Sequence, residues 1–461
     1  MRSPHHPQAP SPLDLVLGAV EEPSPHGIAA AISRLVRDGT LVDGTRLPTV
    51  RAVAGALGVS PATVSTAWQA LAGVGLLTTR GRAGSHVHAP DRTWLPPRYR
   101  GLAGDLGNIR VDLSTGTPDP TLLPDLAAAL ARTGAATPTT SYVEAPVVPA
   151  LEEHLRRTWP YPVESLTVVD GAMDAVSRSL ELVVRFGDRV VIENPGFPPL
   201  LDLLDHLGAV RVPVDVDADG PTPAALTAAL GTSPAAVVLQ PRAHNPTGAS
   251  MSEDRARDLA HVLRTHPDAG RTVVVEDDHS GEVATAPDVS LGTHLPDRVL
   301  HVRSFSKSHG PDLRIAALGG PADLMDRIVA RRMLGPGWTS RTLQRVLLEL
   351  LTGHHGMTAV TEARRVYHSR QARLVRALAT HGVTARPGDG INLWLPVASE
   401  RDATLHLAAA GIRVAPGSPF WSEPGPDHVR VTAGMLRDGV EEVGAVLAAA
   451  TRAQSSSTRS A

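Results

Sequence analysis

Apolar residues recur every three or four positions in three short stretches near the N-terminus, at residues 28–36, 50–57 and 64–71. This spacing predicts amphipathic helices. The segment 57–60 between the second and third stretches holds a glycine, and a serine-proline pair follows at 60–61. Such residues typically end one helix and start the next. Two short helices joined in this way predict a helix-turn-helix.

Two short β-prone segments follow these helices. Residues 76–79 and 85–87 flank the basic stretch Arg80-Gly81-Arg82-Ala83-Gly84, which predicts a two-stranded wing with a basic tip. Residues 31–87 carry six arginines against two aspartates, a local charge of +4 in a chain whose net charge is −3. Any nucleic-acid binding must therefore come from this local patch, because the whole chain gives no basic field.

We expect the second helix of this pair to enter the major groove of double-stranded DNA with its exposed N-terminal side, while arginines hold phosphates. The alternative is a helical module for protein contacts. The candidate DNA-binding residues are Thr49, Arg51, Ser60, Thr63, Ser65, Arg80, Gly81 and Arg82. Thr49 and Ser60 are also the predicted N-caps of the two helices.

Beyond this module, the hydrophobic pattern changes to one large domain. From residue 111 to 450, short apolar runs alternate with alanine- and leucine-rich helical stretches, which predicts an α/β doubly wound sheet. The clearest strand candidates are residues 168–169, 189–192, 236–239, 272–275 and 299–302. Proline-rich residues 88–110 predict a linker. Residues 1–25 and 451–461 are expected to be disordered.

Composition narrows the class further. The chain has 461 residues and no cysteine, which excludes a disulfide framework and cysteine-ligated zinc and suits a cytoplasmic protein. No apolar run is long enough to span a membrane. The 44 basic residues include one lysine, Lys307, so 44 − 1 leaves 43 arginines.

Lys307 is therefore a candidate for amine chemistry. Arginine cannot act as an amine nucleophile because its guanidinium stays protonated, whereas the pKa of a lysine falls on burial. Ser304 lies three residues before Lys307 and Arg314 seven after it. This arrangement fits a Schiff base to pyridoxal 5'-phosphate, with the hydroxyl and the guanidinium on the phosphate. The alternative is a coding bias that spared one lysine.

Four turns follow predicted strands, at the edge where parallel sheets bind ligands. Gly171 opens a helix whose amides form a potential phosphate cup. Phe197 offers a stacking surface, or is simply a core residue. Asn245 presents an amide to a phenolate oxygen. One of the carboxylates of Glu276, Asp277 and Asp278 is suited to keeping a pyridine nitrogen protonated. The alternative, a metal site over 276–279, is disfavoured because adjacent residues of an extended chain point to opposite faces.

The N-terminal motifs Arg46-Leu47-Pro48-Thr49-Val50-Arg51 and Leu57-Gly58-Val59-Ser60-Pro61-Ala62-Thr63-Val64 resemble the winged helix of GntR-family regulators. Pro61 stands where that family usually has a DNA-contacting arginine. The loss of a bidentate base contact removes roughly 1–3 kcal/mol of discrimination. The resemblance therefore implies an unusual operator or more base recognition by the wing.

The ordered strand-end residues, together with Arg430, resemble the fold-type I aminotransferases, and the fusion resembles the MocR subfamily. This likeness implies a large doubly wound domain, a smaller C-terminal α+β domain and a head-to-tail homodimer. It makes Lys307 the catalytic residue, bound to the cofactor as an internal aldimine, and Arg430 the binder of a substrate carboxylate. The cofactor-binding residues it implies are Lys307, Asp277, Asn245, Phe197, Ser304, Ser306, Arg314, Gly171, Ala172, His279 and Tyr142.

The resemblance predicts a transcription regulator that senses an amino compound or pyridoxal phosphate itself. The alternatives are an active aminotransferase with an accessory DNA-binding module, and a DNA-binding protein whose second domain is a cofactor-free scaffold. Several positions depart from the family: His279 replaces a tyrosine, Val147 a glycine, and Asp170 and Ala172 stand where small hydroxyls usually begin the phosphate cup. Asp170 would repel a phosphate unless it points away as the helix cap. These departures count against tight cofactor binding and, more strongly, against catalytic turnover.

Overall fold

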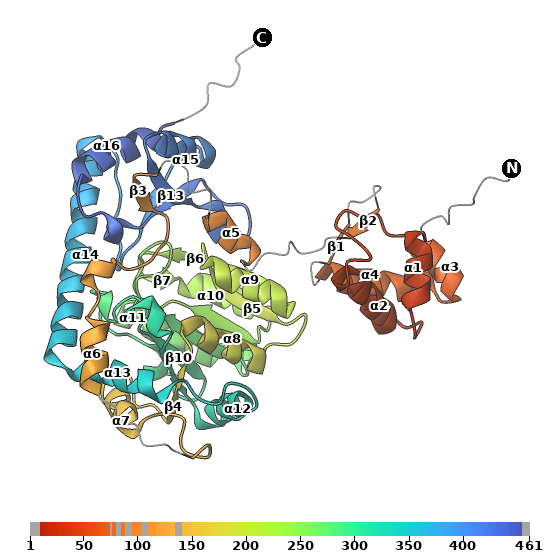
Figure 1. Ribbon diagram of the computed structural model, residues 1–461, viewed down its shortest axis with the longest axis horizontal. Coiled ribbons are helices and arrows are strands. Elements are labelled where there is room, and N and C mark those ends of the chain that lie inside the picture. The colour runs from red at the N-terminus through yellow and green to blue at the C-terminus, as the bar shows by residue number, and fades with distance from the viewer. Residues whose placement is uncertain are drawn as a thin grey trace, which may run out of the picture. The chain divides into compact units, whose positions relative to one another are not determined.

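The computed structural model describes residues 10–73, 76–79, 84–87, 95–103, 109–133 and 141–453. The chain divides into two compact units, Met1–Pro96 and Pro97–Ala461. We call the first the winged-helix unit and the second the effector unit (Figure 1).

The winged-helix unit contains four helices and a two-stranded antiparallel sheet among its described residues: α1 (Pro12–Ala19), α2 (Pro25–Arg37), α3 (Val50–Leu57), α4 (Pro61–Gly73), β1 (Leu77–Thr79) and β2 (Ser85–Val87). Gly58 ends α3 in the left-handed region, with φ 67°, which lets the chain turn sharply into α4. The apolar stripes of α2, α3 and α4 meet in one core around Ile28, Val53 and Val64. The helix-turn-helix predicted from the spacing is therefore present.

The expectation of a disordered segment over residues 1–25 is wrong for its described part. Residues 12–19 form α1, whose N-terminus is fixed by a capping box between Ser11 and Asp14. Val16 is fully buried in the winged-helix core. An eight-residue helix is marginal alone, so this apolar contact stabilises it.

The effector unit is built around an eight-stranded mixed sheet with the order β4-β11-β10-β9-β8-β5-β6-β7. Its strands are β4 (Ser165–Val169), β5 (Arg189–Asn194), β6 (Val210–Asp217), β7 (Gly220–Pro221), β8 (Ala236–Leu239), β9 (Val273–Asp278), β10 (Val299–Ser304) and β11 (Ala316–Gly320). β11 runs antiparallel to β10 and β4, and β7 runs antiparallel to β6. All five strand candidates of the sequence therefore lie in this sheet.

Helices cover both faces of the sheet, because alternate residues of the central strands point in opposite directions. Val190 and Ile192 pack in one apolar cluster with α8 (Ala172–Val183), α9 (Pro198–Leu207) and α12 (Ala322–Met333). Val191 packs in another with α10 (Pro223–Leu230) and α11 (Glu253–Thr265). α7 (Pro149–Arg157) and α13 (Arg341–Thr352) pack against β4 and β11 near one edge of the sheet, and α6 (Leu126–Thr133) packs against α13 (Figure 1).

A smaller α+β domain completes this unit. Its four-stranded sheet has the order β12-β14-β13-β3. Its elements are β3 (Val111–Leu113), α14 (His354–Thr380), β12 (Leu393–Pro396), α15 (Glu400–Ala409), β13 (Ile412–Pro416), β14 (His428–Val431) and α16 (Val440–Ala450). The 27-residue α14 runs alongside both domains (Figure 1).

The predicted linker, residues 88–110, is only partly linker-like. Residues 88–94 and 104–108 lie outside the described residues, but α5 (Pro97–Ala103) is an ordered helix of the effector unit. Arg98 fixes it to α9 through Asp202 at 2.8 Å and Asp205 at 2.7 Å. These long-range ion pairs could not be read from the local proline content.

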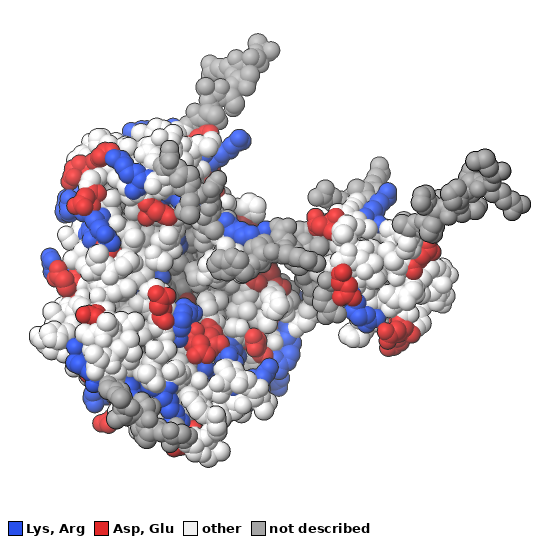
Figure 2. Space-filling view, in the orientation of Figure 1, with Lys and Arg blue, Asp and Glu red and all other residues white. Residues whose placement is uncertain are grey.

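The exposed charge of the effector unit is mixed. On the face shown in Figure 2, acidic and basic side chains are interspersed, so this face offers no broad field of one sign to attract nucleic acid. Among the helices in the described part of the chain, none combines the length and apolar character needed to cross a bilayer.

Candidate functional site

The sheet brings the strand-end residues of the sequence to one edge. Gly171 follows β4, Phe197 follows β5, Asn245 follows β8, Asp277 lies near the end of β9, and Ser304 ends β10. The strands β4, β5, β8, β9 and β10 run in the same direction, so their carboxyl ends share this edge.

Lys307 lies in the turn after β10. Its Nζ donates a hydrogen bond to the carbonyl of Gly116 at 2.6 Å. Burial lowers the pKa of Lys307 to about 8, and the positive charges of Arg430 and Arg314 act in the same direction, against the attraction of Asp277. The amine is thus deprotonated far more readily than an ordinary lysine, as a nucleophile requires.

Asp277 supplies a buried carboxylate with one free oxygen. Its Oδ2 accepts a hydrogen bond from Gln240 Nε2 at 2.9 Å, while its buried Oδ1 has no partner among the described residues. Burial raises the pKa of Asp277, and the nearby His279, Gln240 and Lys307 oppose that rise. Asp277, Gln240, Glu193 and Phe197 line one pocket.

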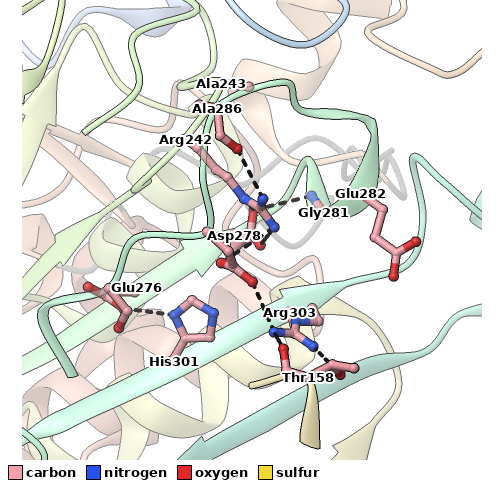
Figure 3. Close-up of polar contacts among 12 residues, drawn as sticks. Thr158, Arg242, Ala243, Glu276, Asp278, Gly281, Glu282, Ala286, His301 and Arg303 are labelled. Atoms are coloured by element: carbon pink, nitrogen blue, oxygen red, sulfur yellow. Dashed lines mark hydrogen bonds and ion pairs between the residues drawn. The ribbon is translucent and has the colours of Figure 1, made fainter. Parts of the chain in front are cut away.

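Asp278 faces away from Asp277, as extended backbone requires. Arg242 binds it with two hydrogen bonds, from Nε at 3.1 Å and from Nη2 at 2.7 Å (Figure 3). Glu276 likewise has its own partners, His301 at 2.7 Å and Ser290 at 2.5 Å. The three consecutive carboxylates therefore do not converge on one point.

A second group of residues gathers around the start of α8. Gly171 has φ 102°, a conformation that favours glycine, and a Cβ there would lie 2.5 Å from Arg314 Nη2. Arg314 Nη2 also donates to the Asp170 carbonyl at 3.3 Å. Ala172 is the first residue of α8, which has no side-chain cap and so leaves its first amides open to an anion.

The Asp170 carboxylate points away from this helix start, but not as the helix cap. Thr339 donates to its Oδ1 at 2.7 Å and Arg332 to its Oδ2 at 3.1 Å, while Gly171 takes the N-cap position. Its negative charge is thus neutralised by Arg332. Nearby, the Ser306 amide donates to Ser304 Oγ at 3.3 Å, which brings both serines to the turn before Lys307.

Arg430 on β14 is a buried cation from the small domain. It donates to Asn245 Oδ1 at 3.3 Å and to the Ser114 carbonyl, and it lies over the Phe420 ring at 5.1 Å. Its Nε has no partner among the described residues, and burial lowers the pKa of Arg430 to about 10. A buried guanidinium bound only to neutral groups is suited to a carboxylate ligand.

His279 is buried near the pocket, whereas Tyr142 is exposed. His279 Nε2 lies 2.9 Å from the Ala243 carbonyl, so this nitrogen carries the proton, and burial lowers the pKa of His279. Tyr142 is 84% exposed and contacts Trp338, with ring centroids 5.7 Å apart. Within one chain Tyr142 is therefore not brought into the pocket.

In the winged-helix unit, two of the predicted DNA-binding residues also cap helices. Thr49 Oγ1 accepts from the Ala52 amide at 3.2 Å, and Ser60 Oγ accepts from the Thr63 amide at 3.2 Å. Arg51 is exposed and Ser65 half-buried. Arg80, Gly81 and Arg82 lie outside the described residues.

Sequence reasoning missed three residues of the site: Gly116, Glu193 and Gln240. Gln240 directly follows β8 and Glu193 is near the end of β5, so their strand-end positions were a usable signal. The sequence around Gly116 held no such signal, because its carbonyl contacts Lys307 only once the chain has folded.

Comparison with solved structures places the effector unit in the aminotransferase fold. The α-aminoadipate aminotransferase LysN from Thermus thermophilus matches with a TM-score of 0.66 and 23% identity, over 77% of this chain and 95% of that chain. The aspartate aminotransferase from the same organism matches with a TM-score of 0.66 and 22% identity, over 78% of this chain and 100% of its own.

Sequence comparison then identifies the family. Residues 108–447 match the model of aminotransferase class I and II, and residues 26–87 match that of bacterial regulatory proteins, gntR family. The chain belongs to the aminotransferase class I and II family and carries a gntR-family DNA-binding domain at its N-terminus. This confirms the predicted combination of a winged helix with an aminotransferase-like domain, and it favours a transcription regulator over an enzyme with an accessory module.

Two regulators resemble the chain over most of its length. The vitamin B6 salvage pathway transcriptional repressor PtsJ of Salmonella typhimurium is 35% identical over 405 residues, covering 87% of this chain and 92% of that protein. The pyridoxine biosynthesis transcriptional regulator PdxR of Corynebacterium glutamicum is 28% identical, over 88% of this chain and 90% of its own.

Proposed function

We propose that this regulator binds pyridoxal phosphate covalently at Lys307 and changes its DNA binding in response to an amino compound or to pyridoxal phosphate itself. The observation that carries the proposal is that one site holds both Lys307, whose pKa is lowered to about 8, and buried Asp277, whose Oδ1 has no hydrogen-bond partner among the described residues. Bound pyridoxal phosphate would supply an aldehyde for the amine and a pyridine ring that draws electrons.

The residues present fit each part of that cofactor. Asp277 Oδ1 would hold the proton on the pyridine nitrogen, and Phe197 would cover the ring. Asn245 and His279 would lie toward the ring oxygen. The phosphate would be bound at the start of α8 by these groups: Gly171, Ala172, Ser304, Ser306 and Arg314. Arg314 supplies the charge that complements the phosphate dianion.

Arg430 would recognise the carboxylate of an amino-compound effector. Its guanidinium is buried, bound to Asn245 and the Ser114 carbonyl, and has an unpartnered Nε among the described residues. The names of both full-length relatives concern vitamin B6, which favours the alternative in which pyridoxal phosphate is itself the signal. Comparing operator binding with the cofactor alone and with added amino acids separates these two effectors.

For DNA binding, the proposed contacts are Arg51, Thr49, Ser60, Thr63 and Ser65, together with Arg80, Gly81 and Arg82 of the wing tip. We further propose a head-to-tail homodimer in which the exposed Tyr142 reaches the partner's pocket. A dimer would present two winged helices to a pair of operator half-sites.

Gel-shift titration of the full-length protein on its own promoter DNA tests the regulator. We expect pyridoxal phosphate to change the operator affinity of the wild type but not of Lys307→Ala. Arg51→Ala should weaken the shift and leave cofactor loading intact, because Arg51 is exposed on α3 in the other unit. The enzyme would be favoured instead if the protein catalysed steady-state transamination with common amino donors and if pyridoxal phosphate did not change the gel shift of the wild type.

A further inference from the structure

Gln240 makes three hydrogen bonds at the centre of the pocket. Its Nε2 donates to Asp277 Oδ2 at 2.9 Å, and its Oε1 accepts from the Asn245 amide at 2.8 Å. Its own amide donates to Glu193 Oε2 at 2.8 Å. One buried side chain thus joins the two residues that flank a ring in the proposed function.

The orientation of this amide follows from its partners. The backbone N–H of Asn245 can only donate, so the oxygen of the Gln240 side chain must face it. The NH2 group then faces Asp277 Oδ2, which accepts its hydrogen bond. Any proton on Asp277, or any donor from a ligand, is therefore directed to Oδ1, the oxygen without a partner among the described residues.

Glu193 holds Gln240 from the other side. Burial raises the pKa of Glu193 well above its usual value, and the negative charge of Asp277 acts in the same direction. The raised pKa favours the neutral form of Glu193, which adds no second negative charge beside Asp277 and still accepts the Gln240 amide.

We propose that Gln240 is a positioning residue that fixes Asp277 and Asn245 relative to each other, with Glu193 as its support. The inference rests on the proposed function, because Asp277 and Asn245 would meet two fixed positions of one rigid ring, the pyridine nitrogen and the ring oxygen. Asp277 and Asn245 can contact the ring at the same time only if the distance between them already matches it. The side-chain amide of Gln240, which is hydrogen-bonded to both residues, fixes that distance. The competing explanation is that Gln240 only satisfies buried polar groups.

The test compares Gln240→Met with Gln371→Met in the full-length protein. Methionine has a similar length but makes neither hydrogen bond. Gln371 is a matched control, because it is also buried and donates to the Asn392 carbonyl at 2.8 Å, outside the groups described for the pocket. The affinity for pyridoxal phosphate is measured by titrating the cofactor-free protein, and hydrogen exchange is followed at the Asn245 amide.

We expect Gln240→Met to weaken cofactor affinity at least about tenfold, equivalent to about 1.4 kcal/mol. Exchange of the Asn245 amide should accelerate by a similar factor. Gln371→Met should leave both unchanged. Equal behaviour of the two variants would overturn the positioning role.

Gln240→Glu supplies a readout that simple packing would not give. Its carboxylate would place an oxygen against Asp277 Oδ2, so the pair must share a proton. We expect its cofactor affinity to fall about tenfold or more as pH rises through the titration of that pair, with no such dependence in Gln240→Met. A pH profile parallel to that of Gln240→Met would contradict the geometry.

Cofactor binding and the positioning role of Gln240 are tested separately by these variants. If the wild type takes up no pyridoxal phosphate, the proposed function is wrong, and the exchange rate of the Asn245 amide in the cofactor-free variants still decides the role of Gln240. If the wild type loads and Gln240→Met loads equally well, only the positioning role is wrong.

Discussion

Asp277 and Asp278 are neighbours on β9, both buried, and the fold treats them in opposite ways. Asp278 receives two hydrogen bonds from Arg242, and although burial pushes its pKa up, Arg242 lowers it overall (Figure 3). Asp277 receives one hydrogen bond, from neutral Gln240, keeps a free Oδ1 among the described residues, and has a raised pKa because of burial.

The charge of Asp278 is neutralised within the protein by Arg242, whereas the charge of Asp277 is left available for a ligand. On the Asp278 side, Asp288 and His301 come close enough to share an ion, yet Arg242 and Arg303 already form ion pairs with the two aspartates. On the Asp277 side, the nearby cations Lys307, Arg314 and Arg430 donate hydrogen bonds to carbonyl and amide oxygens. Arg430 is buried among them, and a buried charge without a fixed counter-ion is costly, so a site that keeps it is suited to a charged ligand.

The largest expected effect is on the structural side. Asp278→Ala leaves Arg242 buried without its main partner, and removing one member of a buried pair typically costs about 3–5 kcal/mol. Chemical denaturation of the cofactor-free protein should show this loss in the effector unit. An unfolding midpoint equal to that of the wild type would contradict the structural role.

The next effect concerns Lys307 and pH. Its folded pKa, about 8, lies below the ordinary value of 10.5, so the unfolded chain binds more protons between these values and stability rises with pH there. The penalty is fully present below about pH 8 and amounts to roughly 3 kcal/mol at most. Lys307→Met should therefore stabilise the cofactor-free protein at neutral pH and flatten the rise. If the free energy of unfolding depended on pH in the same way in the wild type and in Lys307→Met, the amine would not be buried.

A smaller effect is expected for Asp277→Asn. This variant keeps the side-chain shape, so the free energy of unfolding without cofactor should change little. Its affinity for pyridoxal phosphate should fall at least about tenfold, because a charge-assisted hydrogen bond contributes roughly 1.5–3 kcal/mol. Asp278→Asn is the control for the neighbouring carboxylate and should show the reverse pattern. If Asp277→Asn lost stability but kept its affinity for pyridoxal phosphate, Asp277 would have the structural role assigned here to Asp278.

The smallest effect is expected at Ser290, beside Glu276 on the structural side. Ser290→Ala removes the 2.5 Å hydrogen bond to Glu276, while the Leu291 amide at 2.6 Å and His301 remain. We expect a loss of about 1 kcal/mol in stability and unchanged cofactor affinity. A change in cofactor affinity would show that the two sides are coupled.

Much of this site could be predicted because it depends on local sequence features, namely the turns that follow strands and the single lysine. Strand-end turns placed Gly171, Phe197, Asn245 and Asp277 at one edge, and the single lysine indicated the nucleophile. The direction of Asp170 was not predictable, because it depends on Arg332 and Thr339, more than 160 residues along the chain.

The same distinction applies to the fold. The apolar spacing and Gly58 predicted the helix-turn-helix. The helix α1 was missed although Ser11 and Asp14 form a capping box, because its stability depends on packing of Val16 against the rest of the unit. Gln240 was missed because a single amide has no distinguishing pattern until Asp277 and Asn245 are placed beside it.

Borohydride reduction of the full-length protein incubated with pyridoxal phosphate, followed by peptide mass mapping, shows whether Lys307 carries the cofactor. Because Lys307 is the only lysine, we predict one pyridoxyl group per chain, on the peptide that contains residue 307, and none there in Lys307→Ala. An unmodified wild-type peptide would contradict the account.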